Sequence, residues 1–296
     1  MPDLSVIIPA RNEIYLHRTI SGLLEKAEGD IEVIVILDGY WPEPPLKADP
    51  RLIVIHRDKQ GMRASINAGV DISRGKYIMK LDAHCILAQG YDLALQADFE
   101  DDWVVVPRRY SLEMDTWGVR YSRPLVDYEY LGYPFHKRLM HKSKTGIHAW
   151  VWDKRIEERA DQLIDENMTF QGSCWFVNKV EYLKRIGKLD EVGYGTFIGE
   201  AQEIGLKYWL GGGKCMVNKK TWYSHLWKGT PYREAYKAKF GVPYTRMSFS
   251  ELKAGNKFTV DYWMNDRWEG RIHDLKWLID RFSPVPSWEG VYGNPT

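Results

Sequence analysis

Two hydrophobic periods alternate along the first hundred residues, and this alternation restricts the possible folds more than any other feature of the chain. Continuous apolar runs, typical of strands buried on both faces, occur at 4–9, 32–37, 52–55 and 77–81. Between them, apolar residues recur at helical spacing in 16–24 and 62–70. Strands and helices that alternate in this way predict parallel βαβ units with right-handed crossovers, and therefore an α/β fold.

Polar residues directly follow three of these strands. They are residues 9–13 after the first strand, Asp38 after the second and residues 82–84 after the fourth. In open α/β sheets, ligands bind in the crevice beyond the carboxyl ends of the strands. We therefore expect these residues to converge on one crevice.

The rest of the chain is less regular. The predicted elements are strands at 103–107 and 174–177, and helices at 153–165, 180–186 and 200–210, the last of which ends at glycines 211–213. Outside these elements, residues 110–165 are predicted to form long loops, and the basic residues 229–257 are predicted to be rich in loops. The tail from residue 258 is expected to be a short packed appendage that holds Trp263, Trp268, Trp277 and Trp288.

Several classes of protein are excluded by motifs that the chain lacks. It contains no P-loop, no GxSxG elbow, no HExxH and no glycine-rich turn after its first strand. Its three cysteines lack CxxC spacing, which excludes a disulfide framework and a zinc ribbon. There is no run of 18 apolar residues and no signal peptide, so we expect a cytoplasmic protein without a membrane span.

Asp82 and His84 are the clearest candidate ligands for a metal ion. In an extended segment, residues two apart point to the same side, so this carboxylate and this imidazole could bind one cation together. Oxygen and nitrogen ligands suit Mn²⁺ or a similar divalent ion, and a bound diphosphate would complete its coordination. Taken alone, an Asp-x-His pair after a strand is a weak signal that an ordinary surface turn also explains, so these two residues leave both interpretations open.

A series of short motifs occurs in a fixed order along the chain. In the first hundred residues the motifs are 6–13, the strand that ends at Asp38, 61–69, and 77–85 with its Leu-Asp-x-His-Cys sequence. Downstream they are 170–173, 186–190, 199–204, 209–212 and His225. This order resembles the GT-A glycosyltransferases of the family 2 type, and most closely the catalytic domain of the polypeptide N-acetylgalactosaminyltransferases. The resemblance runs from residue 4 to about 228, three quarters of the chain.

The resemblance implies a GT-A fold, which has a Rossmann-like, mostly parallel central sheet, helices on both faces and a loop-rich acceptor side. Residues 1–228 would form the catalytic domain. Within it, residues 1–100 would bind the nucleotide and residues 101–228 would bind the donor sugar and the acceptor. Residues 229–296 would form a basic loop followed by a Trp-rich extension.

The resemblance also assigns roles to individual residues. Asp82, His84 and His225 would hold the metal ion, Mn²⁺ or another divalent cation such as Mg²⁺. Asp82 and Glu200 would be the catalytic residues, with Glu200 on hydroxyls of the sugar or acceptor. Asp38 would accept a hydrogen bond from the uracil of a UDP-sugar, and Arg63 would meet its diphosphate. The donor-binding residues would be Pro9, Ala10, Arg11, Glu13, Asp38, Arg63, Asp82, Ala83, Gly172 and Ser173.

These residues predict a metal-dependent glycosyltransferase that moves a hexose or N-acetylhexosamine from a UDP-sugar to a hydroxyl of a saccharide or of a protein Ser or Thr. Ala201 stands where inverting family 2 enzymes usually have the Asp that acts as general base, which favours retention of configuration. The chain shows no lectin-like domain, so we expect an enzyme of bacterial or viral origin rather than a Golgi enzyme.

One part of the chain is strongly basic and motivates a different acceptor. Residues 204–257 carry 11 Lys and Arg against 2 Asp and Glu, a net charge of +9. Such a stretch could follow a phosphate backbone, so the main alternative is a phage-type DNA glycosyltransferase acting on hydroxymethylated bases. More distant alternatives are a sugar nucleotidyltransferase, whose glycine-rich loop is missing, and a non-catalytic binding module, which would not need metal ligands.

Overall fold

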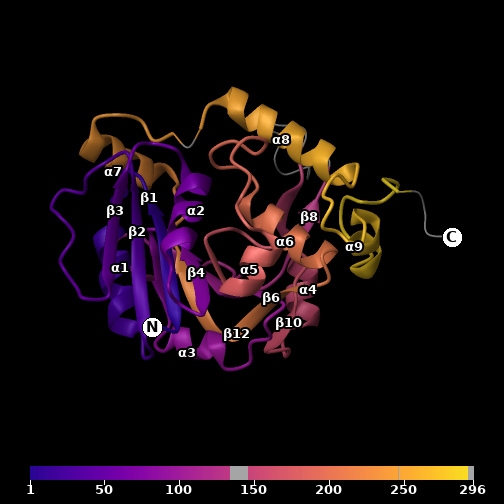
Figure 1. The fold of residues 1–296 in the computed structure, drawn as a ribbon, viewed down its shortest axis with the longest axis horizontal. Coiled ribbons are helices and arrows are strands. Elements are labelled where there is room, and N and C mark those ends of the chain that lie inside the picture. Colours follow the sequence, from indigo (N-terminus) through magenta and orange to yellow (C-terminus); the bar gives the residue numbers. More distant parts are fainter. Residues whose placement is uncertain (134–145, 246, 293–296) are drawn as a thin grey trace.

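Among the residues that the structure describes, ten strands form one mixed sheet through the middle of the molecule. Eight of them follow the order β10-β12-β6-β11-β4-β1-β2-β3, while β5 pairs with β12 and β7 pairs with β6. The computed structural model describes residues 1–133, 146–245 and 247–292. Figure 1 shows the sheet with helices packed around it and the carboxyl-terminal helices on one side.

The first half of the chain forms the parallel part of this sheet. Its strands are β1 (Leu4–Ala10), β2 (Ile31–Asp38), β3 (Leu52–Arg57) and β4 (Tyr77–Leu81). Ile7 packs with helix α2 (Met62–Ile72) in one core cluster, whereas Val6 and Ile8 pack with helix α1 (Leu16–Lys26) in another. Because successive side chains of a strand point to opposite faces, the two helices cover opposite faces of the sheet. The predicted α/β fold is confirmed.

The second half of the chain adds both antiparallel and parallel strands to the sheet. β11 (Cys174–Asn178) lies antiparallel between β4 and β6 (Trp103–Glu113), and β12 (Lys214–His225) is parallel to β6. The short strands that complete the sheet are β5 (Cys85–Leu87), β7 (Gly118–Val119) and β10 (Ile164–Glu166). The sequence did not predict β12, because the polar residues 218–220 interrupt its apolar pattern where its pairing with β6 is irregular.

Smaller elements surround the sheet. They are α3 (Tyr91–Gln96), α4 (Asp153–Glu158), α5 (Lys179–Arg185), α6 (Glu200–Leu210), and a separate two-stranded sheet of β8 (Glu129–Gly132) and β9 (His148–Val151). The helix predicted over 153–165 is too long, since α4 ends at Glu158 and 164–166 form β10. The loops predicted for 110–165 are interrupted by strands, and residues 134–145 of that prediction lie outside the described residues.

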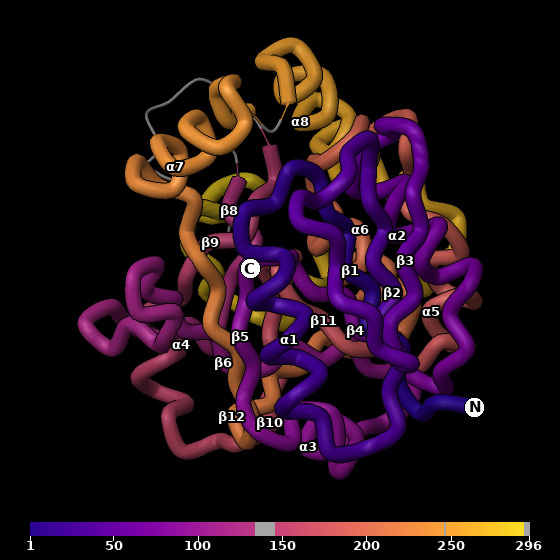
Figure 2. The backbone as a smooth tube through the Cα atoms, turned by 90° about the vertical axis from the view of Figure 1, so that its left-hand side faces the viewer, coloured from indigo at the N-terminus to yellow at the C-terminus, as the bar shows by residue number. Residues whose placement is uncertain are grey.

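Helices replace the loops that were predicted for the basic residues 229–257. These helices are α7 (Thr230–Phe240) and α8 (Phe249–Met264), and α9 (Leu275–Arg281) follows them. Ser248 caps α8 by accepting a hydrogen bond from the backbone N–H of Glu251, whose side chain returns a bond to Ser248. Both views show α7 and α8 on the side where β1 and β2 end (Figures 1 and 2). The tail is packed as predicted, because Trp263 and Trp288 are buried in the main core cluster.

Helix α8 has 16 residues and is the longest helix in the described part of the chain. A helix needs about 20 apolar residues to span the hydrocarbon core of a bilayer. Among the described residues, no helix combines the length and the apolar character that crossing a membrane requires.

Candidate active site

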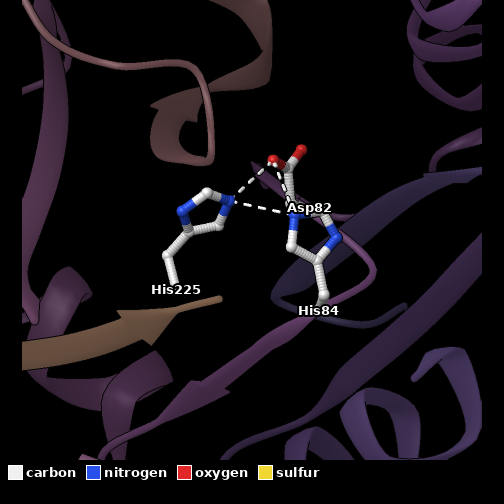
Figure 3. A group of neighbouring side chains, drawn as sticks. All are labelled: Asp82, His84 and His225. Carbon is white, nitrogen blue, oxygen red and sulfur yellow. Dashed lines mark hydrogen bonds and ion pairs between the residues drawn. The ribbon is translucent and has the colours of Figure 1, made fainter. Parts of the chain in front are cut away.

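Three side chains meet where β4, β5 and β12 come together. Asp82 follows the last residue of β4, His84 precedes β5, and His225 ends β12 opposite Cys85 in the pairing of β12 with β5. Their ligand atoms all lie within 4.8 Å of one another, and Figure 3 shows the three side chains pointing toward a common space. His225 Nε2 lies 3.0 Å from His84 Nε2 and 3.3 Å from Asp82 Oδ2. Strand pairing therefore brings His225 to the Asp-x-His pair from 141 residues further along the chain.

The ionisation of Asp82 and His225 suits a cation. Burial lowers the pKa of the His225 imidazole to about 4, so the ring is neutral near pH 7 and keeps a nitrogen lone pair. Burial raises the pKa of the Asp82 carboxyl, but Lys80 and the two histidines outweigh that effect and hold this pKa well below its usual range. One carboxylate and two imidazoles form an oxygen and nitrogen set that divalent ions such as Mn²⁺ accept. The residues therefore fit a divalent metal ion.

A second layer of side chains orients His84. A carboxylate oxygen of Glu13 lies 3.4 Å from Nδ1 of His84, while Nε2 of the same ring faces His225. Lys228 and Tyr232 both donate hydrogen bonds to the Glu13 carboxylate. Burial raises the pKa of Glu13, but Lys228 and His84 outweigh it and lower this pKa to about 2. A carboxylate on the far nitrogen of a histidine fixes the ring, as is common behind metal ligands.

Lys80 links Asp82 to the buried Glu200. Its Nζ lies 2.5 Å from Asp82 Oδ1 and 3.6 Å from a carboxylate oxygen of Glu200, and it also donates to the carbonyl of Gly172. Lys80 therefore occupies Oδ1 of Asp82 and leaves Oδ2 to face the histidines. Glu200 is 4% exposed and accepts a hydrogen bond from the indole N–H of Trp175. A side chain at Gly172 would collide with Glu200, so Glu200 packs directly against the backbone at that position.

A cleft of about 560 Å³ opens onto the three candidate ligands. We call it the strand-end cleft, because it lies beyond β1, β2 and β4 and is closed by residues from the segment that joins α7 to α8. Seven predicted donor-binding residues line it, namely Pro9, Ala10, Arg11, Glu13, Asp38, Asp82 and Ala83. The residues at the strand ends therefore converge on one cleft, as the βαβ pattern predicts.

Asp38 shapes this cleft and keeps room for a ligand. Its carboxylate accepts hydrogen bonds from the backbone N–H groups of Gln60 and Gly61, at 2.7 and 3.1 Å, which hold the loop before α2. A carboxylate offers about four acceptor positions, so a further donor can bind it. Gly172 and Ser173, which were expected at the donor, do not line the strand-end cleft in the described part of the chain, although the preceding Gln171 does.

Arg63 does not reach the strand-end cleft. Its side chain is fully buried and donates to the backbone carbonyls of Asp190 and Ile198 and to the carboxylate of Glu203. The guanidinium also lies over the ring of Tyr194, 4.4 Å from its centre. The structure therefore contradicts the prediction that Arg63 meets a diphosphate, because these contacts use the guanidinium to tie α2 to the region around α6.

Other cations line the strand-end cleft in place of Arg63. They are Arg11, Lys59 and Lys228, of which only Arg11 was expected from the sequence. Lys59 follows β3, and Lys228 follows His225 by three residues. The only sequence signal that could have placed these lysines in the cleft is that Lys59 lies near a strand end and Lys228 near the candidate ligand His225. A lysine in a polar segment usually lies on the surface, so this signal is weak.

A second cleft of about 1040 Å³ adjoins the first and shares Gln171 and His225 with it. We call it the aromatic cleft, because its lining includes Tyr110, Tyr130, Trp150, Trp152, Trp227 and Phe282. Molecules bound in the two clefts can therefore approach each other beside His225.

The amino-acid sequence is similar to known glycosyltransferases. A family model described as Glycosyl transferase family 2 matches residues 5–187. The chain is 26% identical to the uncharacterized glycosyltransferase EpsJ of Bacillus subtilis (strain 168), across 64% of this chain and 60% of that protein. It is 20% identical to the putative polypeptide N-acetylgalactosaminyltransferase 13 of Drosophila melanogaster, across 95% of this chain and 56% of that protein. The chain spans about three fifths of the length of these curated relatives.

The fold is similar to that of a solved structure. The crystal structure of GalNAc-T7 with UDP, GalNAc and Mn²⁺ matches with a TM-score of 0.67 and 18% sequence identity, over 95% of this chain and 56% of that chain. At this identity the likeness shows the fold, and the GT-A fold predicted from the sequence is confirmed.

Proposed function

Because this chain belongs to glycosyl transferase family 2, we propose that it transfers a hexose or N-acetylhexosamine from a UDP-sugar to a hydroxyl acceptor. The observation that carries the proposal is the group formed by Asp82, His84 and His225, which opens onto the strand-end cleft. The same cleft holds Asp38 and three cationic side chains, so it offers partners for a base and a diphosphate as well as for a metal ion.

The donor would lie along the strand-end cleft. Asp38 would accept the imide N–H of uracil, and residues 9–11 would flank the base. Lys59 and Lys228 would donate hydrogen bonds to the diphosphate, because cations on phosphate oxygens form strong charge-assisted bonds. Both lysines line the cleft, and Lys228 is held there by Glu13.

Asp82, His84 and His225 would hold a divalent cation, for which Mn²⁺ is the first candidate. Such a cation, when bound, acts as a Lewis acid that offsets the charge on a leaving diphosphate. Asp82 would present Oδ2, because Lys80 already occupies Oδ1. Glu13 would keep the ring of His84 in place from its other nitrogen.

We propose that the anomeric configuration is retained. A general base must lie within hydrogen-bond reach of the hydroxyl that it activates. Ala201 cannot act as a base, and Glu200 lines neither of the two clefts in the described part of the chain. Glu200 would therefore act through Lys80 rather than on the acceptor directly. Proton NMR of the first product formed gives the configuration, and an inverted product would contradict this part of the proposal.

The basic residues of 204–257 give little support to a DNA acceptor. A nucleic-acid surface gathers exposed Lys and Arg on one face. Lys207 is instead buried in an ion pair with Glu203, and Lys219 is buried with its Nζ 3.8 Å from Asp127. Because Lys228 points to Glu13, several of these charges serve the interior of this protein.

Purified protein and a panel of UDP-sugars test the proposed function. We expect UDP binding that strengthens with Mn²⁺, and UDP release from one of the sugars that stops in EDTA and returns with added Mn²⁺. CDP-sugars serve as the control, since cytosine lacks the imide N–H that Asp38 would accept. Failure to bind UDP and to consume any UDP-sugar in the presence of Mn²⁺ would contradict the proposed function.

A further inference from the structure

The aromatic cleft reaches the candidate metal ligands at His225. It shares only Gln171 and His225 with the strand-end cleft among the described residues that line both. His225 Nε2 lies 3.3 Å from Asp82 Oδ2, so the junction of the two clefts coincides with the metal-ligand group. A second molecule that enters through the aromatic cleft would end beside the donor sugar.

Aromatic side chains form much of the lining of this cleft. Trp227 lines the cleft, two residues after His225, and is 61% exposed. Trp152 and Phe282 are buried in the core and line the deeper part, with their ring centres 6.4 Å apart. Aromatic rings offer flat apolar surfaces whose faces attract the positively polarised C–H groups of a ligand. A pyranose ring has such C–H faces and carries hydroxyls around its edge.

The charges in the aromatic cleft balance. Four cations and four carboxylates line it, namely Arg109, Arg123, Lys154, Arg155, Glu129, Asp153, Glu158 and Glu289. Several of them satisfy each other or the backbone. Arg109 lies 3.0 Å from Glu129, Lys154 lies 3.5 Å from Glu158, and Arg155 donates to the carbonyl of Glu166. A lining without net charge favours a neutral ligand over a polyanion. It does not attract a polyanion, and it has no excess of basic groups that could replace the counterions of one.

Residues 282–289 supply one wall of the cleft and are firmly anchored. Six of them line it, namely Phe282, Ser283, Pro284, Val285, Pro286 and Glu289. The indole N–H of Trp288 donates to the carbonyl of Leu131, and Ser287 Oγ accepts from the backbone N–H of Tyr133. These bonds fix the wall to β8. The family match ends at residue 187, so this wall lies outside the part of the chain that family membership describes.

We propose that the aromatic cleft binds the acceptor, that the acceptor is a neutral saccharide, and that residues 282–289 form the wall that selects it. This assignment rests on the proposed function, since the cleft can receive an acceptor only if the strand-end cleft holds a sugar donor. It gives the carboxyl-terminal segment a role in specificity beyond its contribution to the core.

Two substitutions at exposed positions test the assignment without disturbing the core. Trp227→Ala removes an exposed ring from the lining of the cleft, and Ser283→Trp fills the cleft from its carboxyl-terminal wall. Ser21→Trp is the matched control, because Ser21 is exposed on α1, away from both clefts. Each protein, with UDP and Mn²⁺ present, is applied to an array of neutral glycans and to a Ser/Thr peptide library, and UDP affinity and UDP-sugar hydrolysis are measured in parallel.

We expect wild type and Ser21→Trp to bind the same neutral glycans, and Trp227→Ala and Ser283→Trp to bind them at least tenfold more weakly. Wild type and Ser21→Trp should bind UDP equally and hydrolyse the UDP-sugar at equal rates in water, and UDP binding by Trp227→Ala and Ser283→Trp shows that these two variants are folded. If UDP-sugar hydrolysis proceeds but no neutral glycan binds, or if a peptide binds instead, the saccharide assignment is overturned. If both substitutions leave glycan binding unchanged, the aromatic cleft is not the acceptor site. Failure of UDP binding in wild type would instead refute the proposed function.

Discussion

The two clefts of this protein meet at His225 but are built in different ways. The strand-end cleft is lined by charged groups at the ends of β1, β2 and β4, together with Lys228 and Glu251. The aromatic cleft is lined by several separate segments, of which the first includes Arg109 and the last includes Glu289. Its positive and negative side chains are equal in number. Sheet topology alone can therefore assemble a charged site, because parallel strands end side by side. A site made of ring faces needs distant segments to pack together.

Removing the charge of the central metal ligand should give the largest effect and should affect only one cleft. In Asp82→Asn the amide oxygen can still accept from Lys80, so the local packing is kept. Simple truncation to Ala would leave the buried Lys80 without this partner. We expect transfer to fall about 10³-fold, because metal ions supply several kcal/mol of stabilisation to developing charge. Manganese binding should also weaken, as read by electron paramagnetic resonance.

The matched control for this variant is Asp98→Asn, an exposed carboxylate that pairs with Lys220. It should leave both transfer and Mn²⁺ binding unchanged. Glycan binding in the aromatic cleft should survive in Asp82→Asn. Wild-type activity in Asp82→Asn would show that the three-residue group does not serve as the metal site.

Acid should destabilise the charged cleft through Glu13. Its pKa is about 2 in the folded protein against an ordinary value of 4.5, so its stabilisation is present above pH 4.5 and disappears as the pH falls through 2. The shift corresponds to at most about 3 kcal/mol. Urea unfolding of the metal-free protein should therefore show a gap between wild type and Glu13→Gln that narrows from pH 7 toward pH 2.5.

An acid of the aromatic cleft provides the comparison. Glu289 is exposed, and Glu289→Gln should change the free energy of unfolding by less than about 0.5 kcal/mol at any of these pH values. A gap for Glu13→Gln that stays constant with pH would mean that Lys228 and His84 do not stabilise the Glu13 carboxylate in solution.

Asp38→Ala should weaken the donor through its base. Loss of a hydrogen bond to a buried group costs about 1–3 kcal/mol, so UDP affinity should fall roughly 10- to 100-fold. Isothermal titration with UDP measures this, and the Mn²⁺ requirement and glycan binding should not change. Equal UDP affinity in wild type and Asp38→Ala would mean that the uracil does not bind at the end of β2.

Glu200→Gln should give the smallest effect and should distinguish an indirect role from a direct one. The amide can still accept from Trp175 but no longer carries a charge opposite Lys80. We expect kcat to fall about tenfold, or about 1.4 kcal/mol, because Glu200 would act through Lys80 on Asp82. A loss near 10³-fold with an unchanged KM would restore Glu200 as a catalytic residue that touches the substrate.

The predictions that came from local rules agree best with the structure. The continuous apolar runs and the strand ends placed Asp38 and Asp82 at one cleft, since both properties depend only on neighbours in the sequence. His225 was expected from the family resemblance alone. Its position depends on the pairing of β12 with β5, and the polar residues 218–220 hid β12 from the hydrophobic pattern.

The predictions for Arg63 and Glu200 show the limit of such rules. Arg63 and Glu200 each lie in the first turn of a helix, and charged side chains at that position usually face solvent. In the structure, every residue of α6 from Glu200 to Leu210 is buried. Arg63 on α2 donates hydrogen bonds to backbone carbonyls in the segment before α6. A hydrophobic pattern identifies one apolar face of a helix, but it does not show how many other faces the rest of the chain will cover.

Local patterns were enough to predict the parallel strands, the convergence of their ends on one cleft and the Asp82–His84 pair, because apolar runs and strand ends depend on neighbouring residues. The burial of Arg63 and Glu200, the place of Lys228 in the strand-end cleft and the wall that residues 282–289 form in the aromatic cleft follow from the packing of the whole chain. Contacts between distant segments depend on how all the intervening elements pack, and no short pattern in the chain encodes that packing.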